Sequence, residues 1–104
     1  MMAEKKWFVY ILRCSDGTLY TGMTDDVARR VKVHNSGKGA KYTRGRTPVE
    51  AVYSEECESY SAALKRECAI KRLTRQEKMA LIAECTKINV FFGINIPIDF
   101  YGIL

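Results

Sequence analysis

The sequence has little of what zinc sites, disulfide frameworks and membrane spans require. It holds one histidine and four cysteines, and no two cysteines are spaced CxxC, which leaves little for a Cys/His zinc site. No apolar run near the N-terminus is long enough for a signal peptide, and the C-terminal apolar stretch is too short and too interrupted to span a membrane. We therefore expect a cytoplasmic protein with reduced thiols and no membrane association.

Acidic residues are absent from the segment between Ala28 and Val49, although the formal net charge of the whole chain is only +5. Seven basic residues lie in this segment: Arg29, Arg30, Lys32, Lys38, Lys41, Arg44 and Arg46. A one-sided basic segment is typical of proteins that bind polyanions, nucleic acid first among them. The alternative is an ordinary solvated surface with excess cations.

With 104 residues and no internal repeat or linker, the chain has room for one domain. We place this domain at residues 1–85 and treat residues 86–104 as an apolar C-terminal tail. The tail from residue 88 onward, INVFFGINIPIDFYGIL, has high β-propensity and low charge. It suggests an added strand, a packing arm, a self-association surface or a non-native extension.

The first half of the chain predicts a hairpin followed by a helix. The run WFVYILR at residues 7–13 has strand chemistry, a turn is centred at Asp16-Gly17, and residues 18–22 form the returning strand. A helix follows, capped by Asp25 or Thr24, with Val27, Val31 and His34 on one stripe. The sequence Asn-Ser-Gly at residues 35–37 ends it.

The second half predicts a strand and two helices. The glycine- and lysine-rich stretch at residues 36–47 is a loop that does not match a phosphate-binding P-loop. Residues 48–54 alternate as a strand does, with Val49, Ala51 and Tyr53 on one side. A helix capped by Glu58 or Ser59 runs to residue 73, and Thr74 with the glutamate at 77 forms a capping box for a last helix to about residue 84. The order is β-β-α-β-α-α.

Several stretches, in order along the chain, carry a family resemblance. They are VYIL at residues 9–12, YTG at 20–22, TDDVARRVKVHN at 24–35, SGKGAKYTRGR at 36–46 and ALKRE at 63–67. Together they resemble the GIY-YIG nuclease family over residues 6–83, and look closest to its small stand-alone bacterial members. Here Val-Tyr-Ile at 9–11 stands for GIY, and Tyr-Thr-Gly at 20–22 stands for YIG. The resemblance implies an α+β fold, a three-stranded antiparallel sheet flanked by helices, which agrees with the order above.

The resemblance also implies an active site. Its catalytic residues fall on Tyr10, Tyr20, Arg30 and His34, and its metal ligand falls on Glu67. The implied cofactor is Mg²⁺ or Mn²⁺. The implied activity is metal-dependent endonucleolytic hydrolysis of DNA, directed to a structure or to damage in repair or recombination, with branched or single-stranded DNA as substrate. The alternative is a non-catalytic nucleic-acid-binding module on the same fold.

Each of these positions also has an ordinary structural explanation. A phenol with a pKa of roughly 10 is a poor base at neutral pH unless cations stabilise the phenolate, and Tyr20 is equally well a half-buried strand residue. Arg30 and His34 share a helix face, but Arg30 could simply pair with Asp26 at i,i+4. His34 also suits the helix C-terminus, where a cation meets the helix dipole favourably.

Glu67 is the most telling of the candidates. Its helix neighbours at i−4, i−3 and i+3 are Ala63, Leu64 and Ile70, so it projects from the apolar stripe. A carboxylate there needs a partner, because burying it unpaired is costly. That partner is either Lys71 at i+4 or a magnesium ion, which commonly takes one or two carboxylates with water and phosphate.

The basic loop would hold the nucleic-acid backbone through Lys38, Lys41, Arg44 and Arg46, and Tyr42 would stack on an exposed base. One small domain offers little surface for specificity, so we expect a partner protein or self-association through the tail.

Overall fold

The protein is a three-stranded antiparallel sheet with helices on both faces, as the sequence predicts, in a computed structural model that describes residues 5–91. The strand order is β2-β1-β3, so the first strand is central. The elements are β1 (Trp7–Arg13), β2 (Leu19–Thr24), α1 (Val27–Asn35), α2 (Lys41–Arg44), β3 (Glu50–Cys57), α3 (Tyr60–Lys71) and α4 (Arg75–Phe91). The short helix α2 lies within the stretch expected to be a loop.

The pairing of β1 with β2 in a hairpin determines where the two candidate tyrosines lie. Its turn ends in Gly17 at φ 84°, a left-handed conformation that favours glycine, and the Cys14 N–H donates to the Thr18 carbonyl at 2.8 Å. In the antiparallel register Tyr10 lies opposite Gly22, and Leu12 lies opposite Tyr20. Paired residues point to the same face, so both tyrosines face the same side of the sheet.

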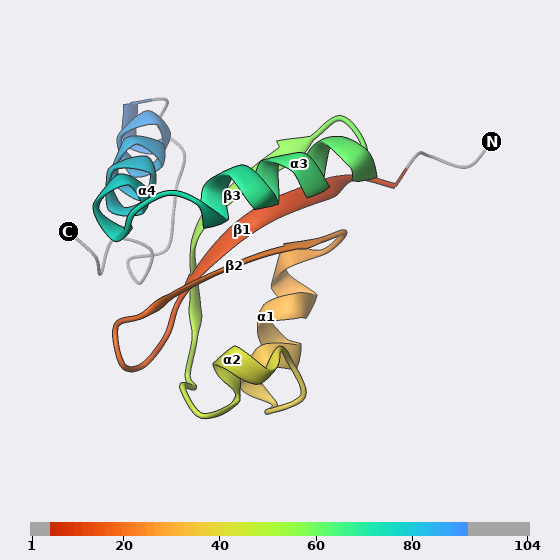
Figure 1. The fold of residues 1–104 in the computed structure, drawn as a ribbon, viewed down its shortest axis with the longest axis vertical. Helices are drawn as coiled ribbons and strands as arrows, with labels where there is room; N and C mark the ends of the chain where they lie inside the picture. The colour runs from red at the N-terminus through yellow and green to blue at the C-terminus, as the bar shows by residue number, and fades with distance from the viewer. Residues whose placement is uncertain (1–4, 92–104) are drawn as a thin grey trace.

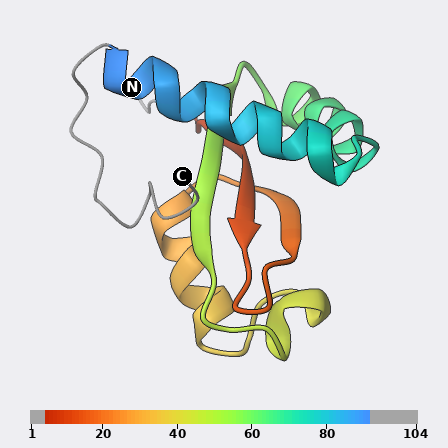
Figure 2. The same cartoon turned by 90° about the vertical axis from the view of Figure 1, so that its left-hand side faces the viewer.

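The two faces of the sheet carry different cores. Helices α3 and α4 cover one face and α1 covers the other (Figures 1 and 2). Under α3 and α4 lies a cluster whose fully buried members are mainly aliphatic: Val9, Ile11, Val52, Ala63, Ile70 and Ile82. Under α1 lies a smaller cluster: Tyr10, Leu12, Cys14 and Val49. Alternation along β1 therefore sends successive residues to different cores.

A bulge corrects one expectation for β3. The register shifts between Ile11 and Leu12, which pair with Tyr53 and Ala51, so Val52 is the extra residue on β3. Ala51 packs with the α1 cluster, but Tyr53 packs with the α3/α4 cluster. The prediction of Ala51 and Tyr53 on one side was wrong because a bulge resets the period of two.

The helix starts were predicted with one error. Ser59 caps α3 by accepting from the Ala62 N–H at 3.0 Å, and Thr74 with Glu77 forms the expected reciprocal capping box, with N–H to oxygen distances of 2.9 and 3.1 Å. Helix α1, however, is capped by neither Asp25 nor Thr24. Asp26 caps it.

Helix α4 extends further than expected, to Phe91, because no glycine or proline interrupts residues 75–91. Of the alternatives offered for the stretch from residue 88, an added strand therefore does not apply to residues 88–91, which are helical. Residues 92–104, where most of the predicted tail falls, lie outside the described residues. Among the helices in the described part of the chain, none is long and apolar enough to cross a membrane.

Candidate active site

Tyr10 lies at the centre of the site, on the face of the sheet that α1 covers. Its side chain is 1% exposed, and Gly22 lies directly opposite on β2. A Cβ at Gly22 would fall 2.6 Å from the Tyr10 hydroxyl oxygen and 3.1 Å from the Tyr20 ring. Glycine is therefore required at position 22, because any side chain would displace the two tyrosines from each other.

The Tyr10 hydroxyl begins a buried chain of hydrogen bonds. It lies 3.0 Å from Nε2 of His34, and Nδ1 of His34 lies 2.8 Å from the Thr43 hydroxyl. The Thr43 hydroxyl in turn donates to the Ala40 carbonyl at 2.9 Å. Tyr10, His34 and Thr43 are all 1% exposed or less. We call this arrangement the Tyr10–His34–Thr43 relay.

The direction of every bond in the relay follows from its last member. Thr43 has one proton and gives it to the Ala40 carbonyl, so its oxygen accepts from Nδ1–H of His34. Neutral His34 then has a lone pair on Nε2, which accepts from the Tyr10 hydroxyl. Burial, and secondarily the positive charge of Arg30, lowers the pKa of His34, which favours this neutral form.

Tyr10 is thereby held as a protonated phenol. Burial raises the pKa of Tyr10 to about 12, while a hydrogen bond and the positive charge from Arg30 oppose the shift. The negative charge of Glu67, and that of Tyr20 whenever it is ionised, act in the same direction as burial. The pKa of Tyr10 is therefore influenced by Arg30, Tyr20 and Glu67, which lie on α1, β2 and α3 respectively.

Tyr20 lies between the relay and the basic loop. Its ring centroid is 5.3 Å from that of His34, 6.4 Å from Tyr10 and 5.9 Å from Tyr42. Its hydroxyl has no hydrogen-bond partner within the described residues, whereas the hydroxyl of Tyr10 is hydrogen-bonded to His34. Tyr20 is therefore the tyrosine whose hydroxyl remains available to a substrate or a water molecule.

Glu67 is partly buried on α3, with a side chain that is 14% exposed and pairs with Lys71 at 3.4 Å. Its neighbours Ala63 and Ile70 are fully buried, whereas Leu64 is 44% exposed, so Leu64 does not belong to the buried stripe as the sequence suggested. No three His, Cys, Asp or Glu residues cluster as a metal site in the part of the chain described here. A single carboxylate does fit Mg²⁺, whose shell substrate phosphate and water can complete.

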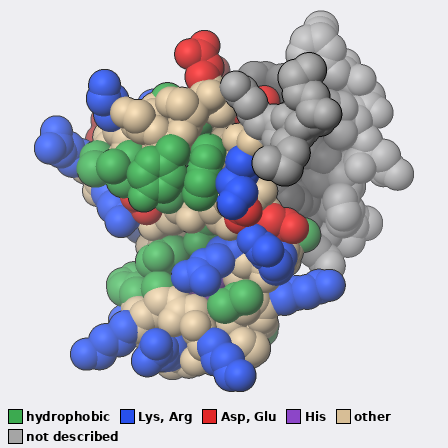
Figure 3. All heavy atoms as spheres, turned by 90° about the vertical axis from the view of Figure 1, so that its right-hand side faces the viewer, with side chains coloured by type: hydrophobic (Ala, Val, Ile, Leu, Met, Phe, Trp, Pro, Cys, Tyr) green, Lys and Arg blue, Asp and Glu red, His purple; other side chains and the backbone are tan. Residues whose placement is uncertain are grey.

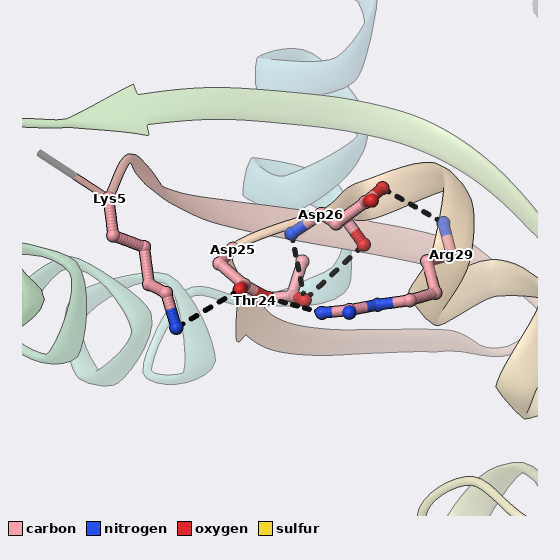
Figure 4. A network of polar contacts seen from close by, with 5 residues as sticks. All are labelled: Lys5, Thr24, Asp25, Asp26 and Arg29. Atoms are coloured by element: carbon pink, nitrogen blue, oxygen red, sulfur yellow. Dashed lines mark hydrogen bonds and ion pairs between the residues drawn. The ribbon is translucent and has the colours of Figure 1, made fainter. Parts of the chain in front are cut away.

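The ordinary explanation offered for Arg30, a pair with Asp26, was wrong. The Asp26 carboxylate accepts from the Arg29 N–H at 3.0 Å, because it caps α1 (Figure 4). Arg29 instead reaches back to Asp25 at 2.7 Å, and Asp25 also pairs with Lys5 at 3.4 Å (Figure 4). Arg30 has no acidic partner among the residues that the structure describes. It lines an open depression of about 380 Å³ together with residues of β2 and α1.

The basic segment places most of its charge on the surface. The charged side chains seen in the lower part of the face drawn in Figure 3, at the height of α1 and α2 in Figure 1, are Lys and Arg. Lys38, Lys41 and Arg44 are exposed, as is Tyr42 at 43%. Arg46 differs from these because its guanidinium lies 4.2 Å from the Tyr42 ring centroid and its Nη1 lies 3.5 Å from Asp16.

Reasoning from the sequence missed three residues that build the site. Thr43 orients His34. Gly39 gives it room, since a Cβ there would fall 2.8 Å from the His34 Cα and closer still to Nδ1. Asn35 bonds both backbone groups of Val49, donating to the carbonyl at 3.1 Å and accepting from the N–H at 2.7 Å. A threonine and a glycine inside a basic loop carry no periodic signal, whereas an asparagine ending a helix was noted only as a stop.

Comparison with known proteins agrees with this fold. Residues 6–80 match the model of the GIY-YIG catalytic domain. The chain is 58% identical over 82 residues to a UPF0213 protein of Haloquadratum walsbyi, covering 79% of this chain and 92% of that protein. It is 60% identical over 77 residues to a UPF0213 protein of Staphylococcus aureus, covering 74% of this chain and 94% of that one.

Two solved structures are also similar. A protein of E. faecalis is 42% identical with a TM-score of 0.54, covering 81% of this chain and 90% of that one. A UPF0213 protein of Bacillus halodurans is 49% identical with a TM-score of 0.50, covering 75% and 83%. The fold and the domain match define a nuclease-type domain. The chain belongs to the GIY-YIG family, whose nucleases typically use divalent metal ions.

Proposed function

We propose that this protein is a metal-dependent endonuclease that hydrolyses phosphodiester bonds in DNA, directed to a branched, single-stranded or damaged structure in repair or recombination. The observation that carries the proposal is the surroundings of the buried Tyr10 side chain. Its hydroxyl lies 3.0 Å from His34 Nε2, its ring centroid lies 6.4 Å from that of Tyr20, and Arg30 and Glu67 both influence its pKa. A cation, a phenol and a carboxylate in this region suit the charge changes of phosphoryl transfer.

The residues take different parts in this proposal. Tyr20, whose hydroxyl has no partner in the described chain, orients the attacking water. As a phenolate that has lost its proton to solvent and that Arg30 or the bound ion would stabilise, it accepts the proton of that water. Arg30, which no acid neutralises there, binds a non-bridging phosphate oxygen and stabilises the charge that develops. Tyr10 and His34, linked in the relay, position Arg30 and the ring of Tyr20.

Glu67 is the proposed metal ligand, with Mg²⁺ or Mn²⁺ as the ion. When bound, the ion would supply Lewis-acid stabilisation of the phosphate. Lys38, Lys41, Tyr42, Arg44 and Arg46 would contact the nucleic acid beside the site. A salt-dependent affinity would follow from these cations.

The test is cleavage of supercoiled plasmid and of branched, single-stranded and duplex oligonucleotides in Mg²⁺, Mn²⁺ or EDTA. We expect Glu67→Gln to lower cleavage by about 10²-fold or more while DNA binding in EDTA stays within about twofold. Glu84→Gln, an exposed glutamate on α4, is the matched control and should cleave normally. Equal cleavage by wild type and Glu67→Gln would refute the metal assignment.

The alternative function is a nucleic-acid-binding module without cleavage, and the Glu67–Lys71 ion pair favours it, because that carboxylate already has a cation. Lys71→Ala separates the two cases. If Glu67 serves a metal, freeing it from Lys71 should leave cleavage intact and lower the metal concentration required. If Glu67 is only a structural partner, no metal will support cleavage in either variant, and thermal stability alone will change.

A further inference from the structure

A second pocket lies beside the candidate active site, between the hairpin turn and the start of α4. Its volume is about 210 Å³, and it is lined by Thr18, Leu19, Tyr42, Arg75 and Lys78. Ligand pockets for drug-sized molecules begin at roughly 300 Å³, so this one suits a small group. Its two cations come from α4, which the sequence analysis did not connect with nucleic acid.

The charges around this pocket favour an anion. Five cations outside the basic segment have acidic partners: Lys5, Lys6, Arg13, Arg66 and Lys71 are ion-paired. Arg75 and Lys78 have no such partner within the described residues. The acids nearest in sequence are already engaged, because Glu77 accepts from the Thr74 N–H and Asp16 accepts from Thr18.

Tyr42 connects this pocket to the candidate active site. Its ring is stacked with Tyr20 at 5.9 Å and lies under the Arg46 guanidinium at 4.2 Å. Its hydroxyl has no hydrogen-bond partner in the described residues and can donate to an oxygen. Tyr42 therefore contacts both the pocket and Tyr20, and the pocket presents the Tyr42 hydroxyl together with the cations Arg75 and Lys78.

We propose that Tyr42, Arg75 and Lys78 form a second phosphate subsite that holds a neighbouring phosphate of the same strand whose scissile phosphate lies at Tyr20 and Arg30. This inference rests on the proposed function, since it takes a nucleic-acid strand as the ligand. It extends the binding surface from the basic loop onto α4. The substrate is accordingly a polynucleotide that follows the gap between the hairpin and α4.

The experiment is oligonucleotide binding in EDTA, by fluorescence anisotropy at several salt concentrations, with the full chain. The double variant Arg75→Ala/Lys78→Ala should reduce the slope of log K against log salt by about one for each cation removed. Tyr42→Phe keeps the ring contacts and loses only the hydroxyl, and should weaken binding by about threefold to tenfold. Lys6→Ala/Lys65→Ala, at two exposed lysines that do not line the pocket, is the charge-matched control.

The outcomes separate this inference from the proposed function. An unchanged salt slope in Arg75→Ala/Lys78→Ala, or the same reduction in the control, overturns the subsite while leaving the nuclease proposal intact. A reduced slope without metal-dependent cleavage supports the subsite and removes the catalytic proposal. Absence of DNA binding by the wild type overturns both.

Two further probes identify the source of the phosphate. Oligonucleotides with and without a 5′-phosphate should bind equally if the subsite takes a backbone phosphate. If the pocket variants no longer affect binding of the oligonucleotide that lacks a 5′-phosphate, the subsite takes a terminal phosphate. That result would overturn the assignment to a backbone phosphate. Competition by inorganic phosphate alone, with no effect of the variants on oligonucleotide binding, would also overturn it.

Discussion

The two faces of the sheet are built from neighbouring residues but differ in chemistry. On the α3/α4 face, Ile11 is fully buried in a cluster of mainly aliphatic side chains. On the α1 face, its neighbour Tyr10 is equally buried but hydrogen-bonded to His34. Apolar contacts tolerate volume-conserving substitution, whereas buried polar groups require specific partners. Strand β1 thus contributes Val9 and Ile11 to the aliphatic core on one face, and Tyr10 to the candidate site on the other.

The largest difference should appear when one residue from each face is altered. Ile11→Ala removes buried methylene groups and should lower the free energy of unfolding by about 2–5 kcal/mol. Tyr20→Phe removes a hydroxyl that no described residue bonds, and should leave the free energy of unfolding within about 1 kcal/mol while reducing cleavage. Urea denaturation with a parallel cleavage assay measures both. Similar destabilisation by the two variants would show that the faces are not separable.

Gly39→Ala tests how closely the site face is packed. The added methyl would overlap the His34 ring, so the free energy of unfolding should fall by about 1–3 kcal/mol and cleavage should fall with it. Gly45→Ala is the matched control, since a Cβ there meets nothing within 4 Å and its φ is −99°. If both variants behave like the wild type, the relay does not depend on this close approach.

Thr43→Ala tests the relay itself. The Nδ1–H of buried His34 would lose its acceptor, which should cost about 1–3 kcal/mol, whereas Thr43→Ser keeps the hydroxyl and should recover most of that loss. Nitrogen NMR of His34 should report protonated Nδ1 in the wild type and in Thr43→Ser. An Nε2-protonated ring in the wild type would reverse both hydrogen bonds of His34 and leave Thr43 no proton to donate to the Ala40 carbonyl.

The smallest effect is a pH dependence that only the site face should show. The folded-state pKa of His34 is lowered, so between that value and the unfolded value of about 6.5 the unfolded chain binds more protons. Stability from neutral His34 is therefore present above about pH 6.5 and is lost as the pH falls, at no more than about 1.4 kcal/mol per pH unit. Urea denaturation between pH 7.5 and 5 should show this slope in the wild type. His34→Gln should lack it, and an equal slope in both would assign the titration elsewhere.

Local signals in the sequence predicted most of the elements, because local chemistry creates them. The capping box at Thr74 depends on residues three apart, and it forms as predicted. The cap of α1 was misassigned because Thr24, Asp25 and Asp26 are all competent caps. Only the backbone geometry selects Asp26, which leaves Asp25 free to pair with Lys5 and Arg29.

Long-range features were less accessible. The bulge opposite Ile11 depends on how β3 meets β1, and residues 48–54 alone read as an uninterrupted alternation. The hydrogen bond between His34 and Thr43 joins α1 to the short helix α2, and no periodicity links the two residues. The candidate catalytic residues came from the family resemblance, and their roles remain predictions. The resemblance did not indicate that Gly39 and Thr43 would contact His34.

The paired hydrogen bonds of Asn35 have a thermodynamic consequence for the basic loop. They fix the end of α1 to Val49, fourteen residues further along the chain, so both ends of the loop are anchored before any ligand arrives. Arg44 adds an internal restraint by donating to the Gly39 carbonyl at 3.1 Å. A loop ordered in advance loses less conformational entropy on association. If the loop binds DNA as proposed, Asn35 strengthens that binding without a contact of its own, because it lowers the conformational entropy that the loop loses on association.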